Sequence, residues 1–192
     1  MRRLRRGALP RVASSDDAPG KRHRLQTAAY LRGGAFLVAE KWIAGSEYKS
    51  VDIFYDEIPH KGKNVANYYI YAVFDSKTTA LIRILVDTEE ACERAEVHAE
   101  GMIITAEAPF ANNPSGTGGV QVISDSKIKS LISGEMLAGC GLPYVLNGFY
   151  AEHEHFCRCL KNGVRPKDDA ASAVQSVEIS EAIRNRVPSV KF

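Results

Sequence analysis

Histidines and cysteines gather in one short stretch of the sequence, HEHFCRC at 153–159. On a helix, His153 and Cys157 form one i, i+4 pair, and His155 and Cys159 form a second pair on nearly the opposite face. Zinc needs three or four protein ligands, and each pair supplies only two. We therefore expect no metal site, with His153 and Cys157 packed in the core and His155 at the surface.

Two glycine-containing stretches could in principle bind phosphate. A dinucleotide fingerprint follows a strand and opens a helix, so that the pyrophosphate reaches the helix N-terminus. SGTGGVQV at 115–122 runs instead into a predicted strand, and PHKGK at 59–63 has no helix after it. Both are predicted to be loops or turns, and we expect no cofactor-binding residue in this chain.

Most of the elements that must position any site are predicted strands. YYIYAVF at 68–74 and TTALIRILV at 78–86 flank the turn DSK and predict a hairpin. Its alternation places Tyr68, Ile70, Ala72 and Phe74 on one face, and the residues between them on the other. Further strands are predicted for AFLVAEKW (35–42), VDIFY (51–55), AEVHA (95–99), MIITA (102–106) and GGVQVIS (118–124), with a loop over 58–64.

Helices are predicted at both ends of the chain. A short one covers 23–32, with Leu25, Ala28 and Ala29 at i, i+3 and i+4. A second, FYAEHEHFCRCLKNG, places Phe149, His153, Phe156, Cys157 and Leu160 on one face. A third follows, with Asp168 as N-cap and Pro188 as its end. About six or seven strands with short turns predict an α+β fold: one open, mainly antiparallel sheet with helices packed on one face.

Composition and charge limit the possible partners. The net charge is +2, but residues 1–24 hold eight Lys and Arg against two acids, so they carry +6 and the rest carries −4. An acidic body offers no basic face for nucleic acid, and no apolar run reaches the roughly 20 residues of a membrane span. We expect a disordered basic tail over 1–22, a single domain over 23–192, and a cytoplasmic protein whose four cysteines are thiols.

Three stretches of the sequence resemble the C-terminal domain of the Gfo/Idh/MocA oxidoreductases. ANYYIYAVFDSKTTALIRILV resembles a strand–turn–strand of that family. EVHAEGMIITAEAPF is similar to its EIxGTxGxLxLxxPF, and AEHEHFCRCLKNGVRPKDDAASAVQSVEISEAI to its xELxxFxxxIxxGxxPxxxxxDxxxAxxIxEAI. Together these stretches span about 66–183, in the family's order and spacing.

The resemblance implies an incomplete enzyme. Family members pair a Rossmann domain, which binds NAD or NADP, with an α/β domain that shapes the sugar or polyol pocket. The exposed sheet face of the second domain often makes the oligomer contact. Only the second domain is expected here, so the chain alone should bind no cofactor and turn over no substrate. A non-catalytic binding or regulatory module of the same family, and a degenerate fragment, are the alternatives.

The resemblance also supplies one catalytic candidate, His23. HRLQTAAYLRGG is similar to the family's HxxDxxxxLxG helix, whose His takes the proton of the substrate hydroxyl while hydride leaves for the nicotinamide. Gln26 stands where an acid is usual. VAEKW at 38–42 is similar to the family's EKP, which contains the other catalytic group, but it follows the His helix and Trp42 replaces the Pro. We expect Lys41 to be an ordinary lysine at a strand end, unless GGAFLVAEK is a Rossmann remnant.

Overall fold

The chain folds around one sheet of nine strands, in the order β8-β7-β6-β5-β1-β4-β3-β2-β9. The computed structural model describes residues 24–29, 35–60, 63–86, 93–109, 116–166 and 169–192, so the tail expected over 1–22 lies outside it. The strands are β1 (Arg24–Ala29), β2 (Tyr48–His60), β3 (Lys63–Phe74), β4 (Thr79–Ile84), β5 (Glu93–Ala99), β6 (Met102–Glu107), β7 (Gly119–Ser124), β8 (Lys127–Ser133) and β9 (Ser189–Lys191). Among these ladders only β1 with β4 is parallel, which confirms a mainly antiparallel sheet.

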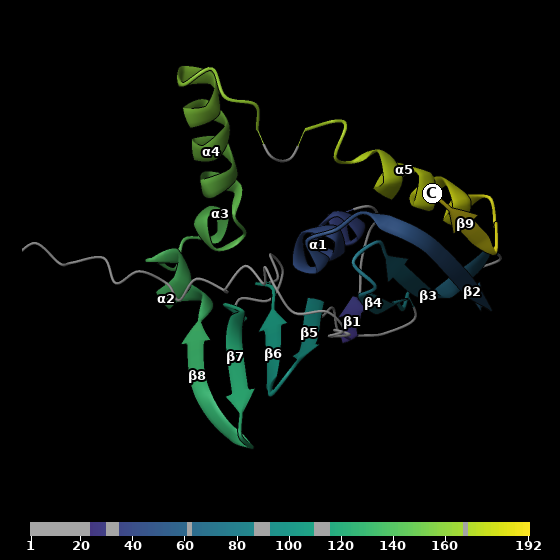
Figure 1. Ribbon diagram of the computed structural model, residues 1–192, viewed down its shortest axis with the longest axis horizontal. Coiled ribbons are helices and arrows are strands. Elements are labelled where there is room, and N and C mark those ends of the chain that lie inside the picture. The colour runs from purple at the N-terminus through teal and green to yellow at the C-terminus, as the bar shows by residue number, and fades with distance from the viewer. Residues whose placement is uncertain (1–23, 30–34, 61–62, 87–92, 110–115, 167–168) are drawn as a thin grey trace, which may run out of the picture.

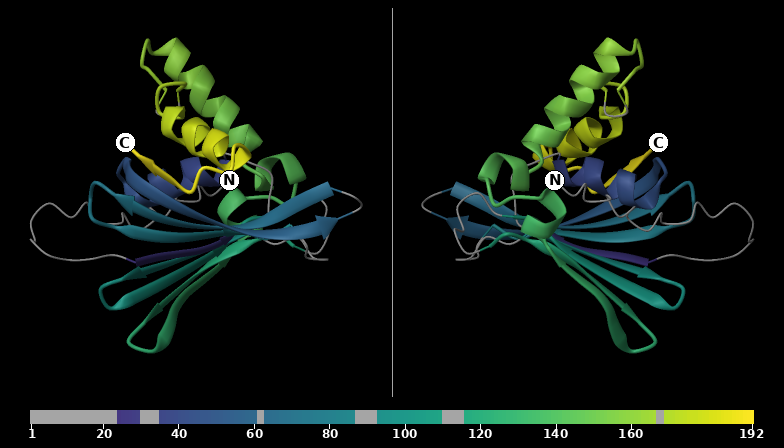
Figure 2. Two further views of the ribbon diagram at one scale, coloured as in Figure 1. Left: turned by 90° about the vertical axis from the view of Figure 1, so that its right-hand side faces the viewer. Right: turned by 90° about the vertical axis from the view of Figure 1, so that its left-hand side faces the viewer.

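Helices lie on one side of this sheet and leave the other side bare (Figures 1 and 2). They are α1 (Ala35–Ala44), α2 (Gly134–Ala138), α3 (Pro143–Leu146), α4 (Phe149–Lys161) and α5 (Val174–Arg184). None of the helices in the described ranges is long and apolar enough to cross a membrane. The architecture is therefore the predicted α+β fold, with an open sheet covered on one face.

The core lies between the helices and the strands β2, β3 and β4. The predicted hairpin is confirmed, with Lys77 at a φ of 67° in its turn. Its alternation buries Ile70, Ala72 and Phe74 completely. These side chains pack against Leu37 of α1, Ile179 of α5 and further core residues: Tyr48, Val51, Ile53, Ala80, Ile82, Ile84 and Ala182. Strand alternation thus selects one face of three strands for the core.

The secondary structure of two neighbouring segments was predicted wrongly, with helix and strand interchanged. Arg24–Ala29 is strand β1 instead of part of a helix, and 35–44 is helix α1 instead of a strand. β1 is a central strand that pairs with β4 on one side and β5 on the other, and this pairing overrides the helical spacing of its sequence. In α1, Leu37 and Lys41 are buried one turn apart, and Gly45 with a φ of 60° follows its end.

Several boundaries also differ from the prediction. The loop expected over 58–64 is largely strand, because β2 continues to His60 and β3 begins at Lys63. β8, β9, α2 and α3 were not predicted, since each is short or lacks clear periodicity. α5 begins at Val174 with Ala173 as its N-cap, whereas Asp168 lies outside the described residues.

Helix α4 forms as predicted, but the face expected to be buried is exposed. Phe149, Phe156 and Leu160 are 57%, 49% and 64% exposed, and His153 is exposed beside them. We call Phe149, Phe156, Leu160 and the following Val164 the α4 stripe. α4 packs mainly against α3 and stands clear of the sheet in Figure 1. The helix therefore has no apolar surface within the described chain against which to bury the α4 stripe.

We expect Ile179→Ala to lower the free energy of unfolding by about 2–5 kcal/mol, because it empties a fully buried position between α5 and the sheet. Val177→Ala is the matched control on the same helix, since Val177 is 61% exposed. It should change stability by less than about 0.5 kcal/mol. Urea unfolding followed by circular dichroism measures both. Equal losses in the two variants would contradict the placement of α5.

Candidate functional site

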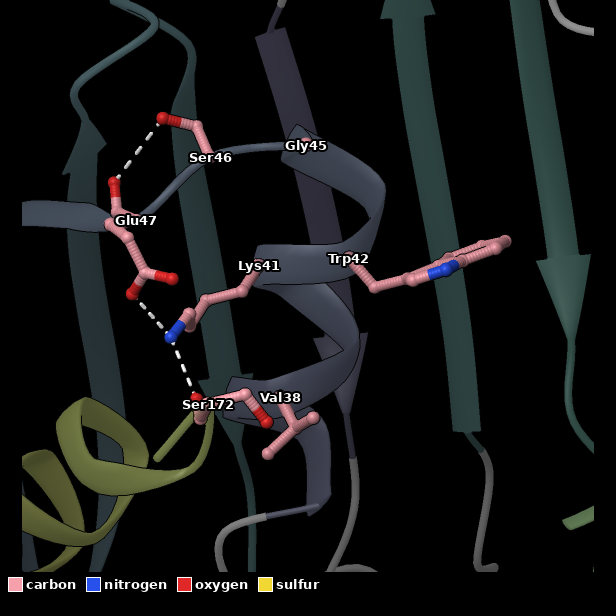
Figure 3. A pocket seen from close by; sticks show the side chains of 7 residues that line it. All are labelled: Val38, Lys41, Trp42, Gly45, Ser46, Glu47 and Ser172. Carbon is pink, nitrogen blue, oxygen red and sulfur yellow. Dashed lines mark hydrogen bonds and ion pairs between the residues drawn. The ribbon is translucent and has the colours of Figure 1, made fainter. Parts of the chain in front are cut away.

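A pocket of about 340 Å³ lies at the C-terminal end of α1. It is lined by Val38, Lys41, Trp42, Gly45, Ser46, Glu47 and Ser172. Figure 3 shows Lys41 turned toward Glu47 and Ser172, while Trp42 points away on the other side of the helix. Lys41 is 9% exposed, and Trp42, the single tryptophan of the chain, is 76% exposed. The polar side chains of the pocket, Lys41 and Glu47, and its aromatic side chain, Trp42, therefore do not face a common space in which one ligand could contact them all.

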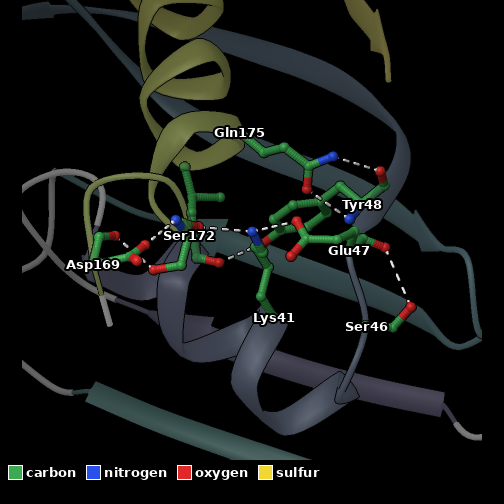
Figure 4. A network of polar contacts seen from close by, with 8 residues as sticks. Lys41, Ser46, Glu47, Tyr48, Asp169, Ser172 and Gln175 are labelled. Carbon is green, nitrogen blue, oxygen red and sulfur yellow. Dashed lines mark hydrogen bonds and ion pairs between the residues drawn. The ribbon is translucent and has the colours of Figure 1, made fainter. Parts of the chain in front are cut away.

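Lys41 connects three segments of the chain. Its Nζ donates a hydrogen bond of 2.8 Å to the carbonyl oxygen of Ser172 and forms an ion pair with Glu47. The backbone N–H of Ser172 donates in turn to the carboxylate of Asp169 at 3.0 Å (Figure 4). A hydrogen bond from Arg165 is the main cause that lowers the pKa of Asp169. The lysine thus fixes the segment before α5 against the end of α1.

A second tie joins the same elements through Tyr48 and Gln175. The side-chain amide of Gln175 accepts from the N–H of Tyr48 and donates to its carbonyl, both at 2.9 Å (Figure 4). The hydroxyl of Tyr48 donates to the carbonyl of Leu37 at 2.8 Å. Burial raises the pKa of Tyr48, with the charges of Glu40 and Glu47 adding to the effect. A phenol held neutral in this way is a structural donor at physiological pH.

These contacts indicate a clamp more than a reaction centre. General acid–base chemistry needs a titratable group within hydrogen-bonding reach of a bound substrate. The Lys41 ammonium is already engaged by the carboxylate of Glu47 and by the carbonyl of Ser172, which lies in the segment before α5. Sequence analysis did not find this network, because the hydrogen bonds that join α1 and β2 to the α5 segment span 127 to 131 residues of the chain. Had 35–44 been predicted as a helix, the position of Lys41 on its apolar face would have indicated a buried partner for this lysine.

Of the residues that the sequence suggested for catalysis, only Lys41 lies within the described chain. His23 lies just outside the described residues, and the segment that follows it is strand β1. Lys41 lies on a helix and not at a strand end, so that expectation is wrong. The helix that precedes the long strand β2 is α1, whose sequence AFLVAEKWIA contains no histidine. α1 by itself therefore offers no His–Lys pair.

The glycines of SGTGGVQV have a structural use. A Cβ added at Gly118, whose φ is 68°, would lie 2.5 Å from the carbonyl oxygen of Glu107. A Cβ at Gly119 would lie 2.7 Å from the carbonyl oxygen of Ile132. These backbones approach closely where β6, β7 and β8 begin or end, and the stretch runs into β7 as predicted. The glycines fit tight backbone packing and do not fit a dinucleotide cradle.

The His–Cys stretch forms one contact. Cys159 Sγ lies 3.6 Å from His155 Nε2, and Cys159 is buried while Cys157 is exposed. The expectation that His153 and Cys157 pack inward is therefore wrong, because both are exposed and the buried residue of α4 is Cys159. Within the described ranges no group of three or more His, Cys, Asp and Glu could hold a metal ion.

We expect Lys41→Met to lower the free energy of unfolding by about 1–3 kcal/mol, because it leaves the Ser172 carbonyl without its donor and Glu47 without its cation. Lys49→Met on the exposed side of β2 is the control and should be near neutral. Chemical denaturation measures both changes. A Lys41→Met protein as stable as the wild type would show that the clamp contributes little.

Comparison with known proteins identifies the fold. No family model and no curated protein matches the sequence. Among solved structures, a dehydrogenase (MviM) from Clostridium difficile superposes with a TM-score of 0.61 at 15% identity, over 89% of this chain and 56% of that chain. The aldose-aldose oxidoreductase from Caulobacter crescentus, complexed with glycerol, gives 0.65 at 15% identity, over 90% and 56%.

A third neighbour is an oxidoreductase from Agrobacterium radiobacter in complex with NAD+, L-tartaric acid and magnesium. It gives a TM-score of 0.62 at 11% identity, over 90% of this chain and 57% of that chain. The chain thus spans little more than half the length of the structures that it matches. The predicted resemblance to Gfo/Idh/MocA oxidoreductases is confirmed for the fold, and the matched part is consistent with a C-terminal domain alone.

Proposed function

We propose that this chain is the C-terminal substrate and assembly domain of an NAD(P)-dependent oxidoreductase that acts on a sugar, polyol or related alcohol. The observation that carries the proposal is the fold match, which covers about 90% of this chain but only about 56% of the oxidoreductases compared. Their remaining part is the place for a cofactor domain. We propose that the chain alone is inactive, and the close backbone approaches at Gly118 and Gly119 support a packing role for its glycine-rich stretch.

The exposed apolar side chains on the helix side of the sheet support the proposal that a further domain packs there. α4, which carries the α4 stripe, and α1, which carries Trp42, lie on the same side of the sheet (Figures 1 and 2). Large exposed apolar surfaces mark contacts with another domain or partner. In the proposed full-length enzyme the cofactor domain covers this side, so that the substrate lies between the two domains. His23 is the residue proposed to take the proton of the substrate hydroxyl.

A non-catalytic binding or regulatory module is the second candidate. The observation in its favour is that α1 contains no histidine and that its lysine is engaged in the clamp. The coding sequence immediately upstream discriminates between the two functions. A G-x-G-x-x-G motif between a strand and a helix, together with an EKP, would favour the enzyme. A different kind of domain there would favour the module.

We expect the isolated chain to bind neither NADH nor NADPH. The test is a titration of each nucleotide that follows its fluorescence and, separately, the emission of the single tryptophan, Trp42. No saturable change should appear up to millimolar nucleotide. Saturable binding at micromolar nucleotide would mean that the chain contains a cofactor site and is not the half-enzyme proposed.

We further propose that the chain self-associates through its bare sheet face. Tyr71 and Leu81 point away from the core and are 42% and 39% exposed. The pairing register places Phe54, Tyr69, Ile128 and Leu131 on the same face. A sheet that is apolar on both faces needs cover on both, and a second copy of the same face supplies it in a closed two-fold pair.

We expect the double variant Tyr71→Lys/Leu81→Lys to be monomeric where the wild type is a dimer, because it places charges in the proposed contact. Val177→Lys/Met136→Lys is the matched control, since both residues are exposed on the helix side. It should leave the mass unchanged. Size exclusion with light scattering at micromolar concentration decides the point, and a wild-type monomer would contradict self-association.

A further inference from the structure

The two ends of helix α4 are held in different ways. Its N-terminal end lies against α3, and the carbonyl of Gly148 accepts a hydrogen bond of 2.9 Å from the N–H of Glu152. Its C-terminal end points away from the sheet and continues into residues 162–173, which lead back to α5 (Figure 1). We call residues 162–173 the linker. The position of the α4 stripe therefore depends on what holds the linker.

An ion pair closes the first part of the linker. The helix ends where Gly163 has a φ of 62° and the N–H of Val164 donates to the carbonyl of Cys159 at 2.9 Å. Beyond this point the guanidinium Nε of Arg165 donates to the carboxylate of Asp169, four positions along the chain. Arg165 is 73% exposed, whereas Asp169 is only 22% exposed. The pair therefore connects the solvent-exposed end of α4 to a residue that lies closer to the body of the fold.

Asp169 also contacts the part of the linker that Lys41 holds. Its Oδ1 accepts from the N–H of Ser172 at 3.0 Å, and its carbonyl accepts from the Ser172 hydroxyl at 2.7 Å (Figure 4). The carbonyl of Ser172 accepts in turn from Lys41 of α1 at 2.8 Å. Polar contacts thus run without a break from Arg165 through Asp169 and Ser172 to Lys41. We call these four residues the linker relay.

The ion pair limits how far the linker can extend. At roughly 3.5 Å per residue, the stretch from Val164 to Ser172 could span about 28 Å when fully extended. The Arg165–Asp169 pair closes about half of that stretch. With the pair formed, the far end of α4 is restricted to a small region relative to α1. Without it, the α4 stripe can take up a wider range of distances from Trp42.

We propose that Arg165 and Asp169 are positioning residues for the helix side of the sheet. Through the linker relay they hold the α4 stripe at a fixed distance from α1 and its Trp42, so that both form one contact surface before any partner arrives. The identity of that partner, the cofactor domain, rests on the proposed function. A surface fixed in advance loses less conformational entropy on docking than a mobile one. The linker relay therefore lowers the cost of joining the two domains.

Distances between two spin labels test this positioning in the chain by itself. One label is attached to the exposed Cys157 of α4 and the other to Trp42→Cys on α1, with the remaining cysteines replaced by alanine. Double electron–electron resonance should give one narrow distance distribution for this reference chain. Asp169→Asn keeps an acceptor for the Ser172 N–H but loses the charge that pairs with Arg165. It should broaden the distribution and shift the ratio of open to closed linkers about two- to fivefold, the effect of one exposed ion pair.

Matched variants separate positioning from folding. Arg165→Met should broaden the distribution as Asp169→Asn does, whereas Arg165→Lys keeps the cation and should leave it narrow. Arg184→Met, which breaks an exposed ion pair with Glu181 on α5, is the control and should have no effect. Melting temperatures should differ by less than about 4 °C, since an exposed ion pair contributes little to stability. High salt should broaden the reference distribution and leave Asp169→Asn unchanged, because only the reference chain has the ion pair to screen.

The outcomes distinguish this inference from the proposed function. A broad distribution in the reference chain, or a narrow one in both Asp169→Asn and Arg165→Met, would overturn the linker relay whatever domain packs on the helix side. If the relay holds but the chain alone binds NADH or NADPH, the positioning stands and the proposed half-enzyme is wrong. Should Asp169→Asn unfold, Arg165→Met tests the same ion pair from its exposed side.

Discussion

The structure depends on an imbalance between the area of its sheet and the number of helices available to cover it. Nine strands present two broad faces, whereas α1 and α5 cover the strands β2, β3 and β4 on one of them. Fully buried side chains gather only there, and the strands β5 to β8 contain no buried position in the described ranges. Apolar surface left in water costs free energy in proportion to its area. The proposed contacts with a cofactor domain and with a second copy would cover the remaining surfaces.

The polar contacts of Lys41, Tyr48 and Gln175, which we call the clamp, are needed because few helices are available to cover the sheet. α5 contributes only a narrow buried face, with Ser176, Ile179 and Ala182 turned inward. Polar ties from Lys41, Tyr48 and Gln175 hold its N-terminal end, and Arg186 holds its C-terminal end by donating to Glu57 and lying over the rings of Tyr55 and Tyr68. Directional bonds at both ends compensate for a small apolar contact, because they fix the helix in one position.

Sequence reasoning succeeded where a local period decides the structure. The hairpin of β3 and β4 alternates strictly, and the alternation assigned Ile70 to the core and Tyr71 to the opposite face. It failed for β1 and α1, because six to ten residues rich in Ala and Leu satisfy both periods and only the neighbouring strands decide. It also failed for the buried face of α4 and for the clamp. Those depend on contacts between residues far apart in the chain, or on a surface that the described chain does not contain.

Strand β1 has a consequence for how the chain can assemble. It lies between β5 and β4, and every path across the sheet from β8 to β2 passes through it. The first strand of the described residues thus joins two halves of the sheet that come later in the sequence, with an antiparallel neighbour in β5 and a parallel neighbour in β4. The two halves can be joined only after β1 has paired with both β5 and β4. Loss of β1 would therefore leave two separate half-sheets. Any polypeptide that precedes it is tethered to the centre of the sheet and not to its edge.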